Sequence, residues 1–151
     1  MRRKPAHLPA EVAAALGRFF RSSGTSRLGP THGDFAPWNL LKAKDDWVLL
    51  DWESATPEGE PFWDVFHFIV QGAALLGKPS TEQIFRGLGG KGWVGAALQA
   101  YATAAGLQMN DAPKAFRVYL THTLPRLDPA TTDGRRGFIT RTEFLARLDQ
   151  Q

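Results

Sequence analysis

The sequence predicts a mainly α-helical fold with one small β-hairpin, an α+β domain that covers residues 1–151 as a single unit. Three observations lead to this prediction. Apolar residues recur at helical spacing over most of the chain after residue 61. Two short apolar runs near residue 40 flank a polar turn. With 43% hydrophobic and 22% charged residues, 151 residues suffice for one core of ordinary globular composition.

The first predicted helix covers residues 9–20 and ends in a polar stretch, residues 22–26. Its apolar side chains recur every three to four positions, which places them on one face. These residues are Val12, Leu16, Phe19 and Phe20.

A β-hairpin is predicted next, from apolar runs at residues 39–42 and 47–51 that a polar turn separates. The segment before it must be loop-like, because Pro37 lacks a backbone donor. Asn39 and Asp51 stand at the outer ends of the two strands. Pairing of the strands would therefore bring these two residues close together.

Beyond residue 61 the pattern predicts a helical body. Residues 62–76 carry an apolar stripe, and Ser80 with Gln83 forms a capping-box signature for a short helix that ends near Gly87. Prolines and Gly134 separate the later candidates. These are residues 93–105, 113–124 and 138–148.

Composition excludes several classes of function. Without cysteine there is neither a disulfide nor a thiolate metal site. No apolar stretch is long enough to span a membrane, and the basic start at residues 1–5 lacks the apolar region of a secretory signal. We therefore expect a cytoplasmic protein without a membrane partner. The net charge of +3 permits an anionic ligand, but no Lys/Arg stripe interleaved with aromatic residues indicates nucleic acid.

The most informative segment reads T-H-G-D-F-A-P-W-N, residues 31–39. His32, Asp34 and Asn39 match the H-x-D-x-x-x-x-N pattern in which protein kinases place a base and a metal ligand. Asp51 follows an apolar strand and stands where a second metal ligand is expected. Carboxylate and amide oxygens suit a hard cation. The spacing thus favours a magnesium nucleotide held next to a hydroxyl acceptor.

Each motif residue has a predicted role. Phosphoryl transfer requires an aligned acceptor and cations that bridge the phosphates. We predict that Asp34 accepts a hydrogen bond from the acceptor hydroxyl, which is worth about 10²–10⁴ in rate. Asn39 and Asp51 are predicted to bind Mg²⁺, and His32 to fix the loop. Taken alone, Asp34 and Asn39 could instead be turn residues around Pro37.

With two later segments, the motif resembles a known family. The runs V-L-L-D-W-E at 48–53 and G-E-P-F-W-D at 59–64 follow it in order. Residues 31–71 are similar to the catalytic segment of the aminoglycoside phosphotransferase and choline kinase-like family. The resemblance implies a protein kinase-like C-terminal lobe, in which residues 72–151 form a helical acceptor-side region.

The resemblance also implies an activity. Family members transfer the γ-phosphate of ATP, as co-substrate, to a hydroxyl of a small molecule, with Mg²⁺ as cofactor. Asp64 is implied to brace the amides of the catalytic loop, with plain capping of its helix as the alternative. Glu53 either reaches the metal or is only solvated.

Related kinases carry an N-terminal lobe with a glycine-rich strand pair and a phosphate-binding lysine. Only thirty-one residues precede His32, and they read as a helix and a loop, so no residue is assigned to that role. We expect a C-terminal lobe alone, weakly active or inactive, with a separate N-lobe chain as a candidate partner. The alternatives are a non-catalytic binding or regulatory remnant, and a metal-dependent phosphohydrolase with His32, Asp34 and Asp51 as ligands.

Some features are discounted. The glycine-rich run at 87–92 follows a predicted helix rather than a strand, and Trp93 stands where a phosphate loop requires Ser or Thr. His67 and His122 are predicted to be ordinary helix residues without ligand partners. Residues 113–151 hold seven Lys/Arg against four Asp/Glu. This balance argues against a polycationic aminoglycoside and favours a neutral or anionic hydroxyl compound as acceptor.

Overall fold

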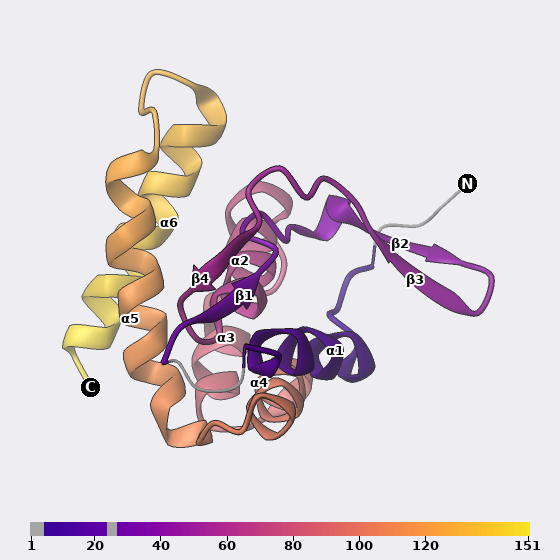
Figure 1. The fold of residues 1–151 in the computed structure, drawn as a ribbon. Coiled ribbons are helices and arrows are strands. Elements are labelled where there is room, and N and C mark those ends of the chain that lie inside the picture. The colour runs from indigo at the N-terminus through magenta and orange to yellow at the C-terminus, as the bar shows by residue number, and fades with distance from the viewer. Residues whose placement is uncertain (1–4, 24–26) are drawn as a thin grey trace.

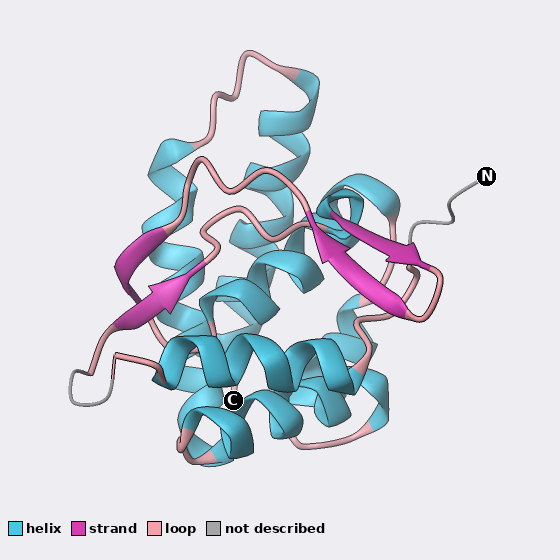
Figure 2. Cartoon of the chain, turned by 45° about the vertical axis from the view of Figure 1, so that its right-hand side comes forward, coloured by secondary structure: helices cyan, strands magenta, loops and turns pink. Residues whose placement is uncertain are grey.

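The computed structural model describes residues 5–23 and 27–151. Most of the basic start and residues 24–26 of the predicted polar loop lie outside the described residues. Within them the chain is mostly helical, with six α-helices and two small antiparallel sheets of two strands each (Figure 2). The predicted helical fold with a hairpin is confirmed at this level, and the second sheet was not predicted.

The helices follow the predicted order, and from α2 onward the connections between them are short. The glycine-rich run joins the third helix to the fourth, as expected for a connection rather than a phosphate loop. The six helices are α1 (Ala10–Arg21), α2 (Trp63–Gln71), α3 (Thr81–Leu88), α4 (Gly92–Ala105), α5 (Ala112–Thr123) and α6 (Thr132–Asp149).

One helix reaches its predicted end through a different geometry, and another begins earlier than predicted. A π-helical turn, Gly72–Leu76, extends α2 to the predicted end of that helix. Helix α6 begins well before residue 138, because Thr131 caps it by accepting a hydrogen bond from the Gly134 amide at 2.9 Å. Gly134 was interpreted as a helix breaker, but it lies in the first turn of α6. A Cβ there would overlap the carbonyl oxygen of Asp128, so close packing accounts for the glycine.

The predicted hairpin is present as β2 (Leu40–Ala43) and β3 (Asp46–Leu49). It projects from the helical body (Figure 1). The indole nitrogen of Trp47 donates a hydrogen bond to a carboxylate oxygen of Glu11 at 2.8 Å, which attaches the hairpin to α1.

The second sheet pairs β1 (Gly29–Thr31) with β4 (Thr56–Gly59) in antiparallel orientation. Gly59 lies opposite Gly29, where a Cβ on Gly59 would overlap the Thr31 side chain. This sheet fixes the start of the loop that carries the H-G-D motif, residues 32–39, which we call the motif loop. The loop begins directly at the end of β1.

Helix α2 is the central helix of the fold. Seven of its nine residues are buried, and it contacts α1, α4, α5 and α6 (Figure 1). Phe66 packs against Phe116 of α5 with ring centroids 4.8 Å apart. Two of the buried α2 residues are polar, Asp64 and His67. The core therefore contains a strip of polar groups directly beneath the motif loop.

The predicted capping box is confirmed at α3. Ser80 Oγ accepts from the Gln83 amide at 3.2 Å, and Gln83 Oε1 accepts from the Ser80 amide at 2.9 Å. We expect Ser80→Ala to lower the free energy of unfolding by about 1 kcal/mol, because it removes a helix cap. Chemical denaturation would measure the change. Ser80→Asn, which retains a capping oxygen, should be close to neutral, and an equal loss in both variants would contradict the assignment.

Candidate functional site

The buried carboxylate of Asp64 holds the motif loop in place. Asp64, in the first turn of α2, accepts the His32 amide on Oδ2 at 2.7 Å and the Gly33 amide on Oδ1 at 3.0 Å. The expectation that Asp64 braces the loop is therefore confirmed. Burial raises the pKa of Asp64, and the two amide donors oppose that effect.

His32 fixes the other side of the loop, as predicted. Its Nε2 lies 2.8 Å from the carbonyl oxygen of Leu50, and its Nδ1 accepts from the Asp34 amide at 3.2 Å. Because a carbonyl oxygen only accepts, Nε2 carries the hydrogen and Nδ1 is free to accept. Both ring nitrogens are thus used within the fold.

Gly33 turns the chain between these two anchors. Its φ is +89°, and a Cβ there would overlap the backbone oxygen of Ser54. Only glycine meets both conditions without strain. The carbonyl oxygen of Gly33 accepts from the Trp63 indole nitrogen at 3.4 Å. This turn directs the next residue, Asp34, away from the buried anchors.

The Asp34 carboxylate is held by a histidine from α2. Asp34 Oδ1 lies 2.8 Å from His67 Nε2, and the side chain of Asp34 is 41% exposed to solvent. The hydrogen bond from His67 lowers the pKa of Asp34, and partial burial opposes this. The prediction that His67 is an ordinary helix residue was wrong. Asp64 and His67 stand three positions apart, and that spacing puts both on one helix face, a signal available in the sequence.

Asn39 lies at the end of the loop and is buried. Its side-chain nitrogen donates to the backbone oxygen of Asp34 at 2.8 Å. This bond fixes the amide so that its remaining polar atom, Oδ1, is the one available to a cation.

Asp51 follows the end of β3 and is exposed, in a left-handed conformation with φ +60°. The Leu50 amide donates to the Asn39 carbonyl at 2.8 Å, and the Leu50 carbonyl accepts from His32. The hairpin therefore brings the backbones at Asn39 and Asp51 together, as its geometry predicts. A shared cation between the two side chains stays a prediction.

The His67 contact predicts a pH effect. A lowered pKa means that Asp34 contributes stability above its unfolded value of about 3.9, and that this contribution is lost as the pH falls through the lower folded value. We expect His67→Leu to raise the pKa of Asp34, measured by carbon NMR of the carboxyl group. His122→Leu, which removes a helix histidine not bonded to Asp34, should leave that titration unchanged. Equal curves for all three proteins would contradict the coupling.

A polar hollow of about 320 Å³ lies beside the loop. Gly33 and Trp63 form part of its wall, Glu58 and Glu60 contribute carboxylates, and Arg126 contributes a guanidinium. It has room for a small polar molecule next to the residue that precedes Asp34.

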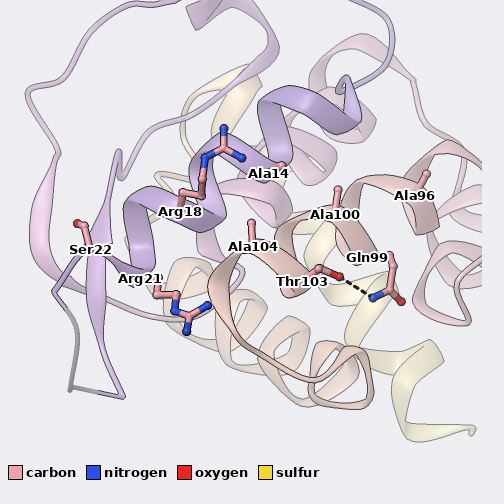
Figure 3. Close-up of a pocket in the computed structure, with 9 residues that line it drawn as sticks. All are labelled: Ala14, Arg18, Arg21, Ser22, Ala96, Gln99, Ala100, Thr103 and Ala104. Atoms are coloured by element: carbon pink, nitrogen blue, oxygen red, sulfur yellow. Dashed lines mark hydrogen bonds between the residues drawn. The ribbon is translucent and has the colours of Figure 1, made fainter.

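A wider groove of about 1000 Å³ lies between α1 and α4 (Figure 3). Its floor is mostly alanine, with Arg18 and Arg21 along one side and a hydrogen bond of 3.2 Å from Gln99 to Thr103 on the other. None of the motif residues lines it. Its volume reflects an open surface, so we place the candidate site at the loop instead.

Two further observations limit the site. In residues 5–23 and 27–151, no cluster of three or more His, Asp or Glu side chains could hold a metal ion by itself. A cation at Asn39 and Asp51 would therefore take further ligands from the nucleotide phosphates. Over the same residues, no helix has both the length and the apolar character needed to cross a membrane.

The H-G-D loop is thus braced by a buried aspartate and has an asparagine tied back to it, which places together residue types that phosphoryl transfer uses. The family model described as the phosphotransferase enzyme family (APH) matches residues 2–107, and the chain belongs to this family. The predicted resemblance is thus confirmed. The searches of curated proteins and of solved structures returned no significant match.

Proposed function

We propose that this chain is the protein kinase-like C-terminal lobe of a phosphotransferase that transfers the γ-phosphate of Mg-ATP to a hydroxyl of a small molecule. Family membership implies a phosphotransferase. The observation that supports the site most directly is the arrangement of Asp34, with one carboxylate oxygen bonded to His67 and the backbone oxygen bonded to Asn39. Because both the carboxylate and the backbone carbonyl of Asp34 are hydrogen-bonded, few orientations are open to the carboxylate.

In this proposal Asp34 orients the acceptor. Oδ1 is occupied by His67, and Oδ2 accepts no hydrogen bond from any described residue. Oδ2 therefore remains available to a substrate hydroxyl at the exposed side of the loop. The lowered pKa of Asp34 keeps the carboxylate ionised at neutral pH, which suits an acceptor of a proton or hydrogen bond.

Asn39 and Asp51 would hold the magnesium ion, which would neutralise part of the phosphate charge when bound. The donor set fits a hard cation, because both residues offer oxygen. The left-handed backbone of Asp51 adds support, since non-glycine residues in that region store strain of about 1–3 kcal/mol and cluster at functional sites.

The acceptor would occupy the polar hollow beside Gly33. Glu58, Glu60 and Arg126 give its wall charges of both signs. Such a wall suits a small hydroxyl compound that is neutral or carries both charges. Because two carboxylates stand against one guanidinium, the wall favours a positively charged group over a negatively charged one.

The described residues before β1 form one helix, α1, and offer no glycine-rich strand pair. We therefore propose weak or no turnover by these 151 residues alone, and that an N-lobe, for which a separate chain is one source, would restore nucleotide affinity. A clear magnesium-dependent turnover of ATP by the purified chain would contradict this part of the proposal.

A non-catalytic binding module remains the second candidate, because Asp51 and the loop could bind a nucleotide without transfer. Nucleotide binding without turnover, unchanged by Asp34→Asn, would favour it. The phosphohydrolase alternative has less support, because both ring nitrogens of His32 are engaged within the fold. Release of phosphate from a monoester without ATP would revive it.

Manganese, a paramagnetic substitute for magnesium, tests the metal site on the 151-residue protein. With Mn²⁺ and ATP, we expect the amide NMR signals of Asn39 and Asp51 to broaden first. Asp51→Asn should weaken the apparent affinity at least about tenfold, because it removes one charged ligand (about 1.4 kcal/mol). The matched control is Asp46→Asn, an exposed aspartate at the opposite end of β3. Broadening that is equal in both variants would refute the metal site.

A further inference from the structure

Arg141 of α6 is a charged side chain in the core, with 1% of its surface exposed. Its Nε donates to Thr123 Oγ1 at 2.8 Å, and its Nη1 donates to the Gly137 carbonyl at 3.2 Å. Its Nη2 donates to the Tyr119 hydroxyl at 3.1 Å and to Gln71 Oε1 at 3.4 Å. All four acceptors are neutral. A buried guanidinium is unfavourable without an opposite charge, so the question is where that charge lies.

The hydrogen bonds have a defined direction. Arg141 can only donate, so the Tyr119 oxygen accepts, and its one hydroxyl hydrogen is left to donate to His67 Nδ1 at 2.7 Å. Burial raises the pKa of Tyr119 to about 12, so the hydroxyl keeps this hydrogen at neutral pH. With Nδ1 accepting, the ring hydrogen lies on Nε2, which faces Asp34 Oδ1 at 2.8 Å. The chain runs from a buried cation to the loop carboxylate.

We propose that Tyr119 and Arg141 fix His67 as its Nε2–H tautomer, and that His67 in this form is the positioning residue that orients the Asp34 carboxylate toward the acceptor. The proposal rests on the proposed role of Asp34 in phosphoryl transfer. The carboxylate at the far end of the hydrogen-bond chain that begins at the buried guanidinium is that of Asp34.

The tautomer matters because the two forms of histidine act oppositely on a carboxylate. With the hydrogen on Nε2, His67 attracts Oδ1 of Asp34 and leaves Oδ2 for the acceptor. With the hydrogen on Nδ1, a lone pair would face Oδ1, and the carboxylate would turn away. The Tyr119 hydroxyl excludes the second form by supplying the hydrogen that Nδ1 accepts.

Packing keeps this chain in place. The Trp63 ring meets Tyr119 edge to face with centroids 4.9 Å apart, and the Arg141 guanidinium lies 5.7 Å from the centre of the Tyr119 ring. Helices α5 and α6, which carry Tyr119 and Arg141, lie side by side in Figure 1. Both residues lie beyond residue 107, where the family match ends. The C-terminal helices thereby contribute to the site through His67.

The nitrogen chemical shifts of the His67 ring, measured on the whole chain, test the proposal. In the wild-type protein we expect a protonated Nε2 and an unprotonated Nδ1. Tyr119→Phe, which removes only the hydroxyl, should move both signals toward the average of the two tautomers. The control is Tyr101→Phe, the same change at an equally buried tyrosine whose oxygen accepts from the Phe62 amide at 3.2 Å. It should leave the His67 ring unchanged.

Two substitutions at position 67 complete the test through the carboxyl carbon signal of Asp34. His67→Gln can donate to Asp34 and accept from Tyr119, so this signal should stay close to that of the wild type. His67→Leu can do neither, and the signal should shift. A protonated Nδ1 in the wild type, or a His67 ring unaffected by Tyr119→Phe, would overturn the proposal.

The outcome is independent of the metal experiment. Loss of Mn²⁺ binding at Asn39 and Asp51 with the tautomer as expected would refute the proposed function and leave the positioning of Asp34 by His67 intact. Normal Mn²⁺ binding with the other tautomer would refute the positioning alone.

Discussion

Replacing Asp64 by alanine is expected to lower the free energy of unfolding by about 3 kcal/mol, since each buried donor left without a partner costs about 1–3 kcal/mol. Asp64 is 2% exposed, and it is the acceptor for the His32 and Gly33 amides. Asp64→Asn should cost less, because its amide keeps one acceptor oxygen. Denaturant unfolding measures both changes, and the amide signals of residues 32–34 report whether the loop is displaced.

A second acidic residue separates bracing from helix capping. Asp133 also lies in the first turn of a helix, α6, but it is exposed. Asp133→Asn removes only a favourable interaction with the helix dipole, worth about 0.3–1 kcal/mol. If Asp64→Asn and Asp133→Asn had equal effects, the loop amides would not depend on Asp64, and the bracing would be refuted.

The two acids near the loop contribute to stability with opposite pH dependence. Burial raises the pKa of Asp64, so its contribution is greatest below its unfolded value and declines as the pH rises through the folded value. His67 lowers the pKa of Asp34, so its contribution is present above the unfolded value and is lost as the pH falls. The loop thus pairs a structural acid in a dry site with a partly exposed acid that stays ionised.

The sequence predicted the parts of the site that are local. Asp34 and Asn39 lie five residues apart, and their link through the Asp34 carbonyl is a contact within one loop. The hairpin was readable from alternating apolar and polar runs, and it brings Asp51 to the same place. The hairpin is confirmed because spacing along the chain determines spacing in space over such short distances, whereas the roles of Asp34, Asn39 and Asp51 stay predictions.

The features that the sequence did not predict are contacts between residues distant in sequence and strands without a recognisable strand pattern. His67 meets Asp34 across 33 residues and Tyr119 across 52, and such contacts depend on how α2 packs against α5. The sheet of β1 and β4 was missed because its strands, G-P-T and T-P-E-G, are rich in residues that strands disfavour. Only the paired backbone reveals that these short segments carry the motif loop.

Gly33→Ala is expected to cost about 1–2 kcal/mol for the left-handed backbone and about 1–3 kcal/mol more for overlap with Ser54. Gly77→Ala is the matched control, because Gly77 has a similar φ of +71° against +89°, and a Cβ there would meet nothing within 4 Å. Only the first cost applies to Gly77, so the difference between the two variants measures the crowding at the loop.

The same pair of variants tests whether the turn at Gly33 positions Asp34. If Gly33→Ala moves the loop, the hydrogen bond between Asp34 and His67 should lengthen, and the lowered pKa of Asp34 should return toward its ordinary value. Gly77→Ala should leave that pKa unchanged, because a Cβ at Gly77 would meet nothing within 4 Å and so would displace no neighbouring group. Equal destabilisation with an unchanged Asp34 pKa in both variants would mean that the carboxylate is held by His67 alone, without help from the turn.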